Sequence, residues 1–146
     1  MDPDAEARRS AQEDIRAQLS LAGELGGCGV FVIPILDYTQ NYPGGPRTGR
    51  TRDGDREVLT DSLAELAAHA HQAGATLLFE VINRYESPVA NSLTECAEIV
   101  QRVAQINFRL NANLFHMNIE EDDPVAALRQ HWTVLGHFHA GDSMRT

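Results

Sequence analysis

Five polar side chains interrupt or follow apolar segments in a pattern that could support chemistry. They are Glu80, Asn113, His116, His137 and His139. The last two are two residues apart, so in a strand they point to the same face. Carboxylate, amide and imidazole groups together suit a hard to borderline divalent ion such as Mn²⁺, Mg²⁺, Co²⁺ or Zn²⁺. The residue types therefore indicate a metal or acid–base site.

Each of these residues also has a purely structural interpretation. A carboxylate inside an apolar strand is costly unless it is paired, hydrogen-bonded or metal-bound, and Arg84 or backbone N–H groups could satisfy Glu80. The histidine pair could be one core and one surface residue. A lone histidine such as His116 is more often structural. We expect Trp132 and Phe138 to lie in the core.

The pattern of apolar residues predicts alternating helices and strands. We expect helices over residues 5–25, 57–73, 92–104 and 124–131, and strands over 28–36, 75–82, 108–114 and 133–138. Residues 37–56, rich in Gly, Pro, Asn, Thr and Arg, are predicted to form a long loop. The segment from Phe115 to Glu121 is predicted to be a polar loop after its strand.

This alternation indicates an α/β fold with a parallel sheet and right-handed crossovers. No Gly-x-Gly-x-x-Gly follows a strand, so a dinucleotide-binding fold has no positive support. A (β/α)₈ barrel fits better, but a full one needs about 250 residues and eight strands. We therefore predict a single domain over residues 1–146, a partial barrel of about four β/α units with a leading helix within residues 1–27.

Composition excludes several classes of function. The net charge of -9 disfavours nucleic acid as a partner. The chain has no lysine, which excludes a Schiff-base or P-loop lysine within it. No apolar run is long enough to cross a membrane and the N-terminus lacks the apolar segment of a signal peptide, so we expect a cytoplasmic protein. Cys28 and Cys96 are expected to be free, buried thiols.

Three motifs resemble a known family. Residues 80–86, Glu-Val-Ile-Asn-Arg-Tyr-Glu, resemble a signature strand of the xylose isomerase-like sugar isomerases and epimerases. Residues 114–121, Leu-Phe-His-Met-Asn-Ile-Glu-Glu, and 136–145, Gly-His-Phe-His-Ala-Gly-Asp-Ser-Met-Arg, look like the next two. The order and spacing of the motifs are most similar to those of the ketose 3-epimerases of the D-tagatose and D-psicose type.

The resemblance implies a TIM barrel and an isomerase that uses a divalent metal, Mn²⁺ first and otherwise Mg²⁺ or Co²⁺. It implies that Glu80 binds metal and acts as acid/base, and that Asn113 and His139 are metal ligands. By the same resemblance Glu86, His116 and Arg145 hold oxygens of the sugar, and His137 supports the site. The family has an aspartate where this chain has Asn113, so we expect metal affinity lower by roughly one to two orders of magnitude.

The implied reaction is proton transfer beside a carbonyl through an enediolate, with C3 epimerisation of a ketose favoured. Inosose dehydratases and hydroxypyruvate isomerases use similar strands and act on a related polyol or keto acid. Either activity stays an alternative to C3 epimerisation. A non-catalytic, sugar-binding or structural half-barrel is a third. An open half-barrel leaves two sheet edges unpaired, so we also expect a homo-oligomer.

Overall fold

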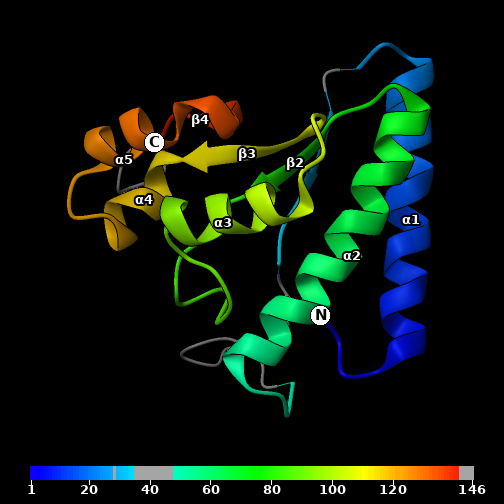
Figure 1. Ribbon diagram of the computed structural model, residues 1–146, viewed down its shortest axis with the longest axis horizontal. Helices are drawn as coiled ribbons and strands as arrows, with labels where there is room; N and C mark the ends of the chain where they lie inside the picture. Colours follow the sequence, from blue (N-terminus) through cyan, green and yellow to red (C-terminus); the bar gives the residue numbers. More distant parts are fainter. Residues whose placement is uncertain (28, 35–47, 142–146) are drawn as a thin grey trace.

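Helices and strands alternate along the chain, as Figure 1 shows. The computed structural model describes residues 1–27, 29–34 and 48–141. The helices are α1 (Ala5–Glu24), α2 (Arg52–Ala73), α3 (Leu93–Val103), α4 (Leu114–Glu120) and α5 (Pro124–His131), and a 3₁₀ turn spans Trp132–Val134. The strands are β1 (Val30–Val32), β2 (Leu77–Glu80), β3 (Phe108–Asn113) and β4 (Leu135–His139).

The strands form one parallel sheet in the order β1-β2-β3-β4. Each strand therefore pairs with its neighbour in the sequence, as in a (β/α) barrel that has been opened. The predicted α/β fold and its partial barrel are confirmed. Within the described residues, β1 and β4 are the two edges of the sheet.

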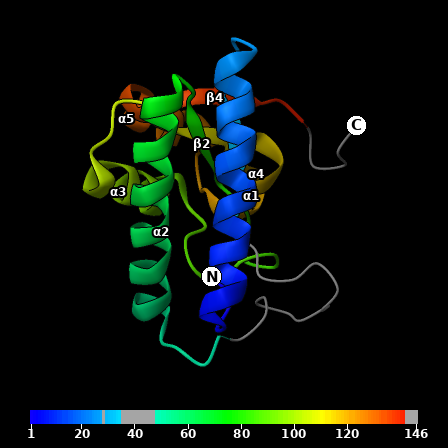
Figure 2. The ribbon, with the colours of Figure 1, turned by 90° about the vertical axis from the view of Figure 1, so that its right-hand side faces the viewer.

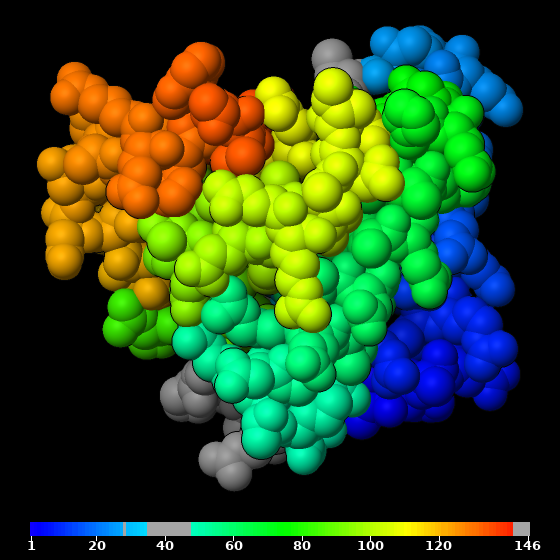
Figure 3. All heavy atoms as spheres, viewed as in Figure 1, coloured from blue at the N-terminus to red at the C-terminus, as the bar shows by residue number. Residues whose placement is uncertain are grey.

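The two faces of the sheet differ in what covers them. Leu77, Phe79, Phe108 and Leu110 point to the helices and are fully buried in the core. Figure 3 shows this covered side, on which α1, α2 and α3 lie next to one another. Successive strand residues alternate between faces, so Glu80 points to the opposite side. That side carries the polar residues of the strands.

Helices α1 and α2 run side by side in the same direction, as Figures 1 and 2 show. Arg16 pairs with Glu65 at 3.0 Å, and one turn further on Ser20 lies 2.9 Å from His69. At the ends of the two helices a Cβ atom on Gly23 would lie only 1.9 Å from the carbonyl oxygen of Ala73. A glycine at this position is therefore what allows the two helices to approach.

The start of α2 corrects one expectation. Residues 37–56 were predicted to be loop, but α2 begins at Arg52, where the Thr51 hydroxyl accepts a hydrogen bond from the N–H of Gly54. This N-cap was overlooked because the glycine and arginines around it suggest a loop. The predicted end was right, since Gly74 closes α2 in the left-handed conformation. Residues 35–47 lie outside the described residues.

Helix α3 begins with a capping box. Ser92 caps the helix and Glu95 returns the contact to the backbone of Ser92. Cys96 in the same helix is a free and fully buried thiol, as expected, and burial raises its pKa. Cys28 lies outside the described residues.

The last strand is less covered than the sequence suggests. Trp132 and Phe138 were expected in the core, but they are 70% and 42% exposed. Phe138 belongs to the edge strand β4 and Trp132 to the 3₁₀ turn that precedes it, and no described strand pairs with the outer side of β4. These two apolar side chains are therefore exposed at the surface.

Candidate functional site

A bulge in the sheet decides which residues of β4 face the site. Leu110 pairs with Leu135, but the next residue, Asn111, pairs with His137, so Gly136 is an extra residue in β4. A side chain on Gly136 would meet the Cβ of Arg109 at 2.5 Å, which only glycine avoids. A shift of one residue moves a strand's side chains to the other face. The bulge thus aligns the histidines of β4 with the asparagines of β3.

Glu80 is the centre of the first group of polar side chains. It ends β2 and is only 7% exposed. Its Oε1 atom accepts a hydrogen bond from Nδ2 of Asn113 at 2.7 Å and lies 3.3 Å from Nδ1 of His139. Residues from three neighbouring strands therefore meet at one carboxylate oxygen. Arg84, which the sequence left open as a partner of Glu80, binds Glu120 instead.

Asn111 connects the two histidines of β4 and is fully buried. Its Oδ1 lies 3.1 Å from Nδ1 of His137 and its Nδ2 lies 2.9 Å from Nδ1 of His139. The two imidazole rings pack edge to face with centroids 5.1 Å apart, and Phe31 of β1 contacts both of them at 5.0 Å. The histidine pair therefore shares one face, and Asn111 fixes the orientation of both rings.

Asn113 ends β3 and at the same time begins α4. Its Oδ1 accepts a hydrogen bond from the N–H of Phe115 at 3.1 Å, which makes it the N-cap of the helix. Residues 115–121 were predicted to be a loop, and this is wrong because Leu114–Glu120 form two turns of helix. A segment of seven residues is too short for helical periodicity to be seen in the sequence.

A second group of polar side chains lies where the chain leaves β2. Asn83 donates its backbone N–H to Nδ1 of His116 at 3.2 Å, and its Nδ2 lies 2.8 Å from the same atom. The Nδ2 group also donates to Oε1 of Glu86 at 3.1 Å. Asn83 thereby holds two of the residues expected to bind sugar, and Nδ1 of His116 lies 3.9 Å from Oε1 of Glu86.

An ion pair ties this second group to α4. Nε of Arg84 donates to both carboxylate oxygens of Glu120 at 3.0 Å, and Nη2 donates at 2.8 Å. The backbone N–H of Arg84 adds a bond of 2.6 Å. Burial alone would raise the pKa of Glu120, but these hydrogen bonds and the charge of Arg84 hold that pKa below its ordinary value. The same contacts raise the pKa of Arg84.

The structure brings together most of the predicted site residues and adds two. Glu80, Asn113 and His139 form one group, and Glu86 and His116 form the other. Arg145 lies outside the described residues. Sequence reasoning assigned no role to Asn83 or Asn111. The signal for Asn111 was present, since Arg109, Asn111 and Asn113 alternate along an otherwise apolar strand.

The donor set agrees only in part with a divalent ion. Oε1 of Glu80 and Nδ1 of His139 are 3.3 Å apart, a spacing that two ligands of one ion can adopt. Asn113 instead presents N–H to Glu80, because its oxygen caps α4. Among the described residues no group of three or more His, Cys, Asp or Glu side chains could hold a metal ion. The described residues by themselves therefore do not make a complete metal site.

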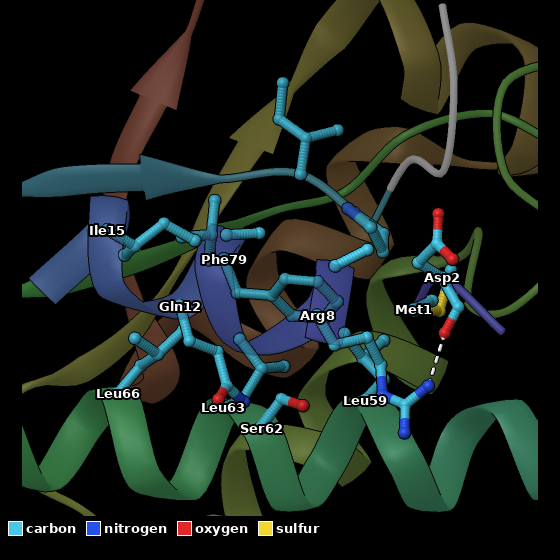
Figure 4. A pocket seen from close by; sticks show the side chains of 15 residues that line it. Met1, Asp2, Arg8, Gln12, Ile15, Leu59, Ser62, Leu63, Leu66 and Phe79 are labelled. Carbon is cyan, nitrogen blue, oxygen red and sulfur yellow. Dashed lines mark hydrogen bonds between the residues drawn. The ribbon is translucent and has the colours of Figure 1, made fainter. Parts of the chain in front are cut away.

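A separate cavity of about 300 Å³ lies between α1, α2 and the sheet. Figure 4 shows that its walls are mainly apolar, with Ile15, Leu63, Leu66 and Phe79 among them. Phe79 precedes Glu80 in β2, so the cavity lies on the helix side of the sheet and is distinct from the polar groups.

None of the described helices has the length and apolar composition that a membrane span requires.

Comparison with known proteins agrees with this architecture. The family described as xylose isomerase-like TIM barrel matches residues 1–146. The chain is 32% identical to 3-dehydro-D-guloside 4-epimerase of Escherichia coli over 142 residues, which are 96% of this chain and 53% of that protein. It is 31% identical to D-psicose 3-epimerase of Ruminiclostridium cellulolyticum, with 98% of this chain and 47% of that protein covered.

Solved structures give the same result. A 3-keto-D-glucoside 4-epimerase from E. coli matches with a TM-score of 0.82 and 30% identity, covering 92% of this chain and 51% of that one. A D-psicose 3-epimerase with D-tagatose, from Clostridium cellulolyticum, matches with a TM-score of 0.82 and 29% identity, covering 99% and 49%. The chain thus spans about half the length of these relatives, and it belongs to the xylose isomerase-like TIM barrel family.

Proposed function

We propose that this chain forms the part of a ketose 3-epimerase-type site that holds the sugar and one acid/base group. The observation that carries the proposal is the meeting of β2, β3 and β4 at Oε1 of Glu80, with Asn113 and His139 as the contacting residues. Polar residues at the carboxyl ends of parallel strands are where barrels build their sites. Relatives named as 3-epimerases of D-psicose and L-ribulose support the same class of substrate.

Glu80 is the proton-transferring group in this proposal. Its Oε1 is occupied by Asn113, whereas Oε2 has no hydrogen-bond partner among the described residues. A carboxylate oxygen in that state can take the proton from C3 of a ketose, next to the C2 carbonyl. Negative charge then develops on the carbonyl oxygen as the enediolate forms, and a hydrogen-bond donor or cation held beside that oxygen would stabilise it.

The second group of polar residues positions the sugar. Asn83 holds Glu86 and His116 in fixed orientations, and these are two of the residues that the family resemblance implies hold oxygens of the sugar. Arg145 is proposed to join them, as the family resemblance implies. Positioning of this kind lowers the barrier because the C3 proton must lie within hydrogen-bond reach of Glu80.

The family resemblance implies a divalent metal, with Mn²⁺ as the first choice and Mg²⁺ or Co²⁺ as the others. Such an ion would act as a Lewis acid on the sugar oxygens. Glu80 and His139 are the residues that would hold it. The steps proposed above use only groups of this chain. Inosose dehydratase and hydroxypyruvate isomerase activities have no specific support, because the relatives named above are epimerases.

The exposed edges support self-association as part of this proposal. β1 and β4 are unpaired on their outer sides within the described sheet, and exposed apolar side chains lie on or beside them, among them Phe31 and Phe138. A second chain that pairs with these edges would cover them. We place the function in the cytoplasm, in keeping with the free thiol of Cys96.

Proton exchange at C3 tests the role of Glu80. The chain is incubated with fructose, tagatose or psicose in D₂O, and deuterium at C3 is followed by NMR. Inversion at C3 needs a second acid on the opposite face of the sugar, but exchange with solvent needs Glu80 alone. We expect exchange with the wild-type chain and with Glu57→Gln, a control on the exposed surface of α2, and background exchange with Glu80→Gln.

Two results would count against the proposal. Equal exchange by the wild type and Glu80→Gln would remove Glu80 from the reaction. An absence of exchange with every sugar, together with saturable sugar binding in NMR saturation-transfer experiments, would favour the non-catalytic sugar-binding alternative.

A further inference from the structure

The orientation of the Asn113 side chain is fixed by two neighbours, one a hydrogen-bond donor and the other an acceptor. Oδ1 accepts from the backbone N–H of Phe115, and Nδ2 donates to the carboxylate of Glu80. Rotating the amide by 180° would bring NH₂ against an N–H and oxygen against a carboxylate. Both contacts would then be repulsive, so only one orientation satisfies the site.

This orientation means that Asn113 offers Glu80 a hydrogen-bond donor and not a lone pair. The N–H group has partial positive charge and lies 2.7 Å from the carboxylate oxygen that faces His139. A carboxylate buried to this extent needs such compensation. The N–H group of Asn113 therefore places beside the Glu80 carboxylate the positive charge that a bound cation would otherwise provide.

The imidazole of His139 is also contacted by the amide of an asparagine from β3. The imidazole nitrogen that lies nearest to Glu80 is also 2.9 Å from the NH₂ group of Asn111. The two asparagines of β3 thus place donors against both atoms that could bind one ion. An incoming cation would have to displace these donors before it could coordinate either atom.

We propose that Asn113 makes the Glu80–His139 pair of this chain work as a hydrogen-bonded site without a tightly bound divalent ion, and that the exchange Asn113→Asp alone converts it into a metal site. The inference rests on the proposed function only in that it concerns the same residues. An aspartate keeps the oxygen that caps α4, so the variant retains its helix start. Its second oxygen replaces the N–H donor and completes a set of two carboxylates and one imidazole.

Titration with MnCl₂ tests the inference without any sugar. Binding is measured by calorimetry and by the shift of the unfolding temperature on addition of Mn²⁺. We expect Asn113→Asp to bind about tenfold or more tightly than the wild type, in line with the effect of ligand environment on metal affinity. Without metal its unfolding temperature should be lower, because two carboxylates then face each other, and Mn²⁺ should raise it.

Two further variants serve as controls. Asn118→Asp makes the same chemical change on the exposed side of α4 and should bind Mn²⁺ as weakly as the wild type. Asn113→Asp combined with Glu80→Gln should lose the gained affinity, which locates the ion at Glu80.

The wild-type chain by itself can overturn the inference. Stoichiometric Mn²⁺ binding by the wild type that is lost in Glu80→Gln would show that the amide does not prevent coordination. That comparison does not use Asn113→Asp, so it stands even if this variant fails to fold. Failure of the C3 exchange experiment would leave the metal titration unaffected, so the two proposals fail separately.

Discussion

Arg84 and Glu120 join the loop after β2 to the last turn of α4 through four hydrogen bonds to one carboxylate. The Glu120 side chain is only 5% exposed, while that of Arg84 is 60% exposed. The pair lies next to Asn83, which holds Glu86 and His116. This contact thus joins the two segments that carry Glu86 and His116, the residues proposed to bind the sugar.

This pair predicts a specific dependence of stability on pH. The pKa of Glu120 is lowered by folding, so its contribution is fully present above the unfolded pKa of about 4.3 and is lost as the pH falls through the lower folded value. Glu120→Gln should reduce the free energy of unfolding at pH 7 and have less effect near pH 3. Urea denaturation at both values measures the difference.

Glu57→Gln provides the matched control for this prediction, since Glu57 is an exposed glutamate on α2. Its effect should be small at both pH values. A loss of stability in Glu120→Gln that is equally large at pH 3 and pH 7 would show that the contribution of Glu120 does not depend on its charge.

Gly23→Ala should destabilise the packing of α1 on α2. Alanine normally favours a helix over glycine by about 1 kcal/mol. Here the added Cβ would lie 1.9 Å from the carbonyl oxygen of Ala73, so the helices must move apart. We expect a net loss of about 1–3 kcal/mol in chemical denaturation, the usual range for overpacking.

Gly54→Ala is the comparison for this substitution. Its added Cβ would approach the hydroxyl of Thr51 at 3.3 Å and the Cβ of Arg50 at 3.5 Å, both much farther away than the oxygen that Gly23→Ala would meet. The change in stability should stay within about 1 kcal/mol. Equal effects of the two substitutions would mean that the close approach of α1 and α2 is not the cause.

Gly136→Ala should disturb the bulge that presents the histidines of β4. The new Cβ would meet Arg109 Cβ at 2.5 Å and a methyl group of Leu78 at 2.9 Å. We expect a loss of about 1–3 kcal/mol from overpacking. We also expect changed NMR shifts for the rings of His137 and His139, with the His71 ring on α2 unchanged. Unchanged shifts for all three would show that β4 tolerates the side chain without moving.

Local chemistry accounts for what the sequence predicted well. Ser92 with Glu95 and the terminal Gly74 set helix ends through contacts within a few residues. The strand ends could be found because apolar runs give way to polar residues there, as at Glu80 and Asn113. Parallel strands then bring these ends to one edge of the sheet. For this reason the sequence predicts that Glu80, Asn113 and His139 lie at the same edge.

The parts that could not be predicted depend on single residues or on distant partners. The extra residue at Gly136 leaves no periodic signal, although it decides which face the histidines take. The orientation of the Asn113 amide depends on α4, which the sequence did not show. The exposure of Trp132 depends on what packs against the edge of the sheet, and no local pattern contains that information.

The strand order has a consequence for how this chemistry can be inherited. Because neighbours in the sheet are neighbours in the sequence, both groups of polar residues lie in one uninterrupted stretch from Glu80 to His139. A gene rearrangement that moves this stretch moves Glu80, the proposed acid/base residue, together with its partners Asn113 and His139. A designed fusion that transplants this stretch would also need an aromatic side chain in the place of Phe31, which packs against both histidines from β1.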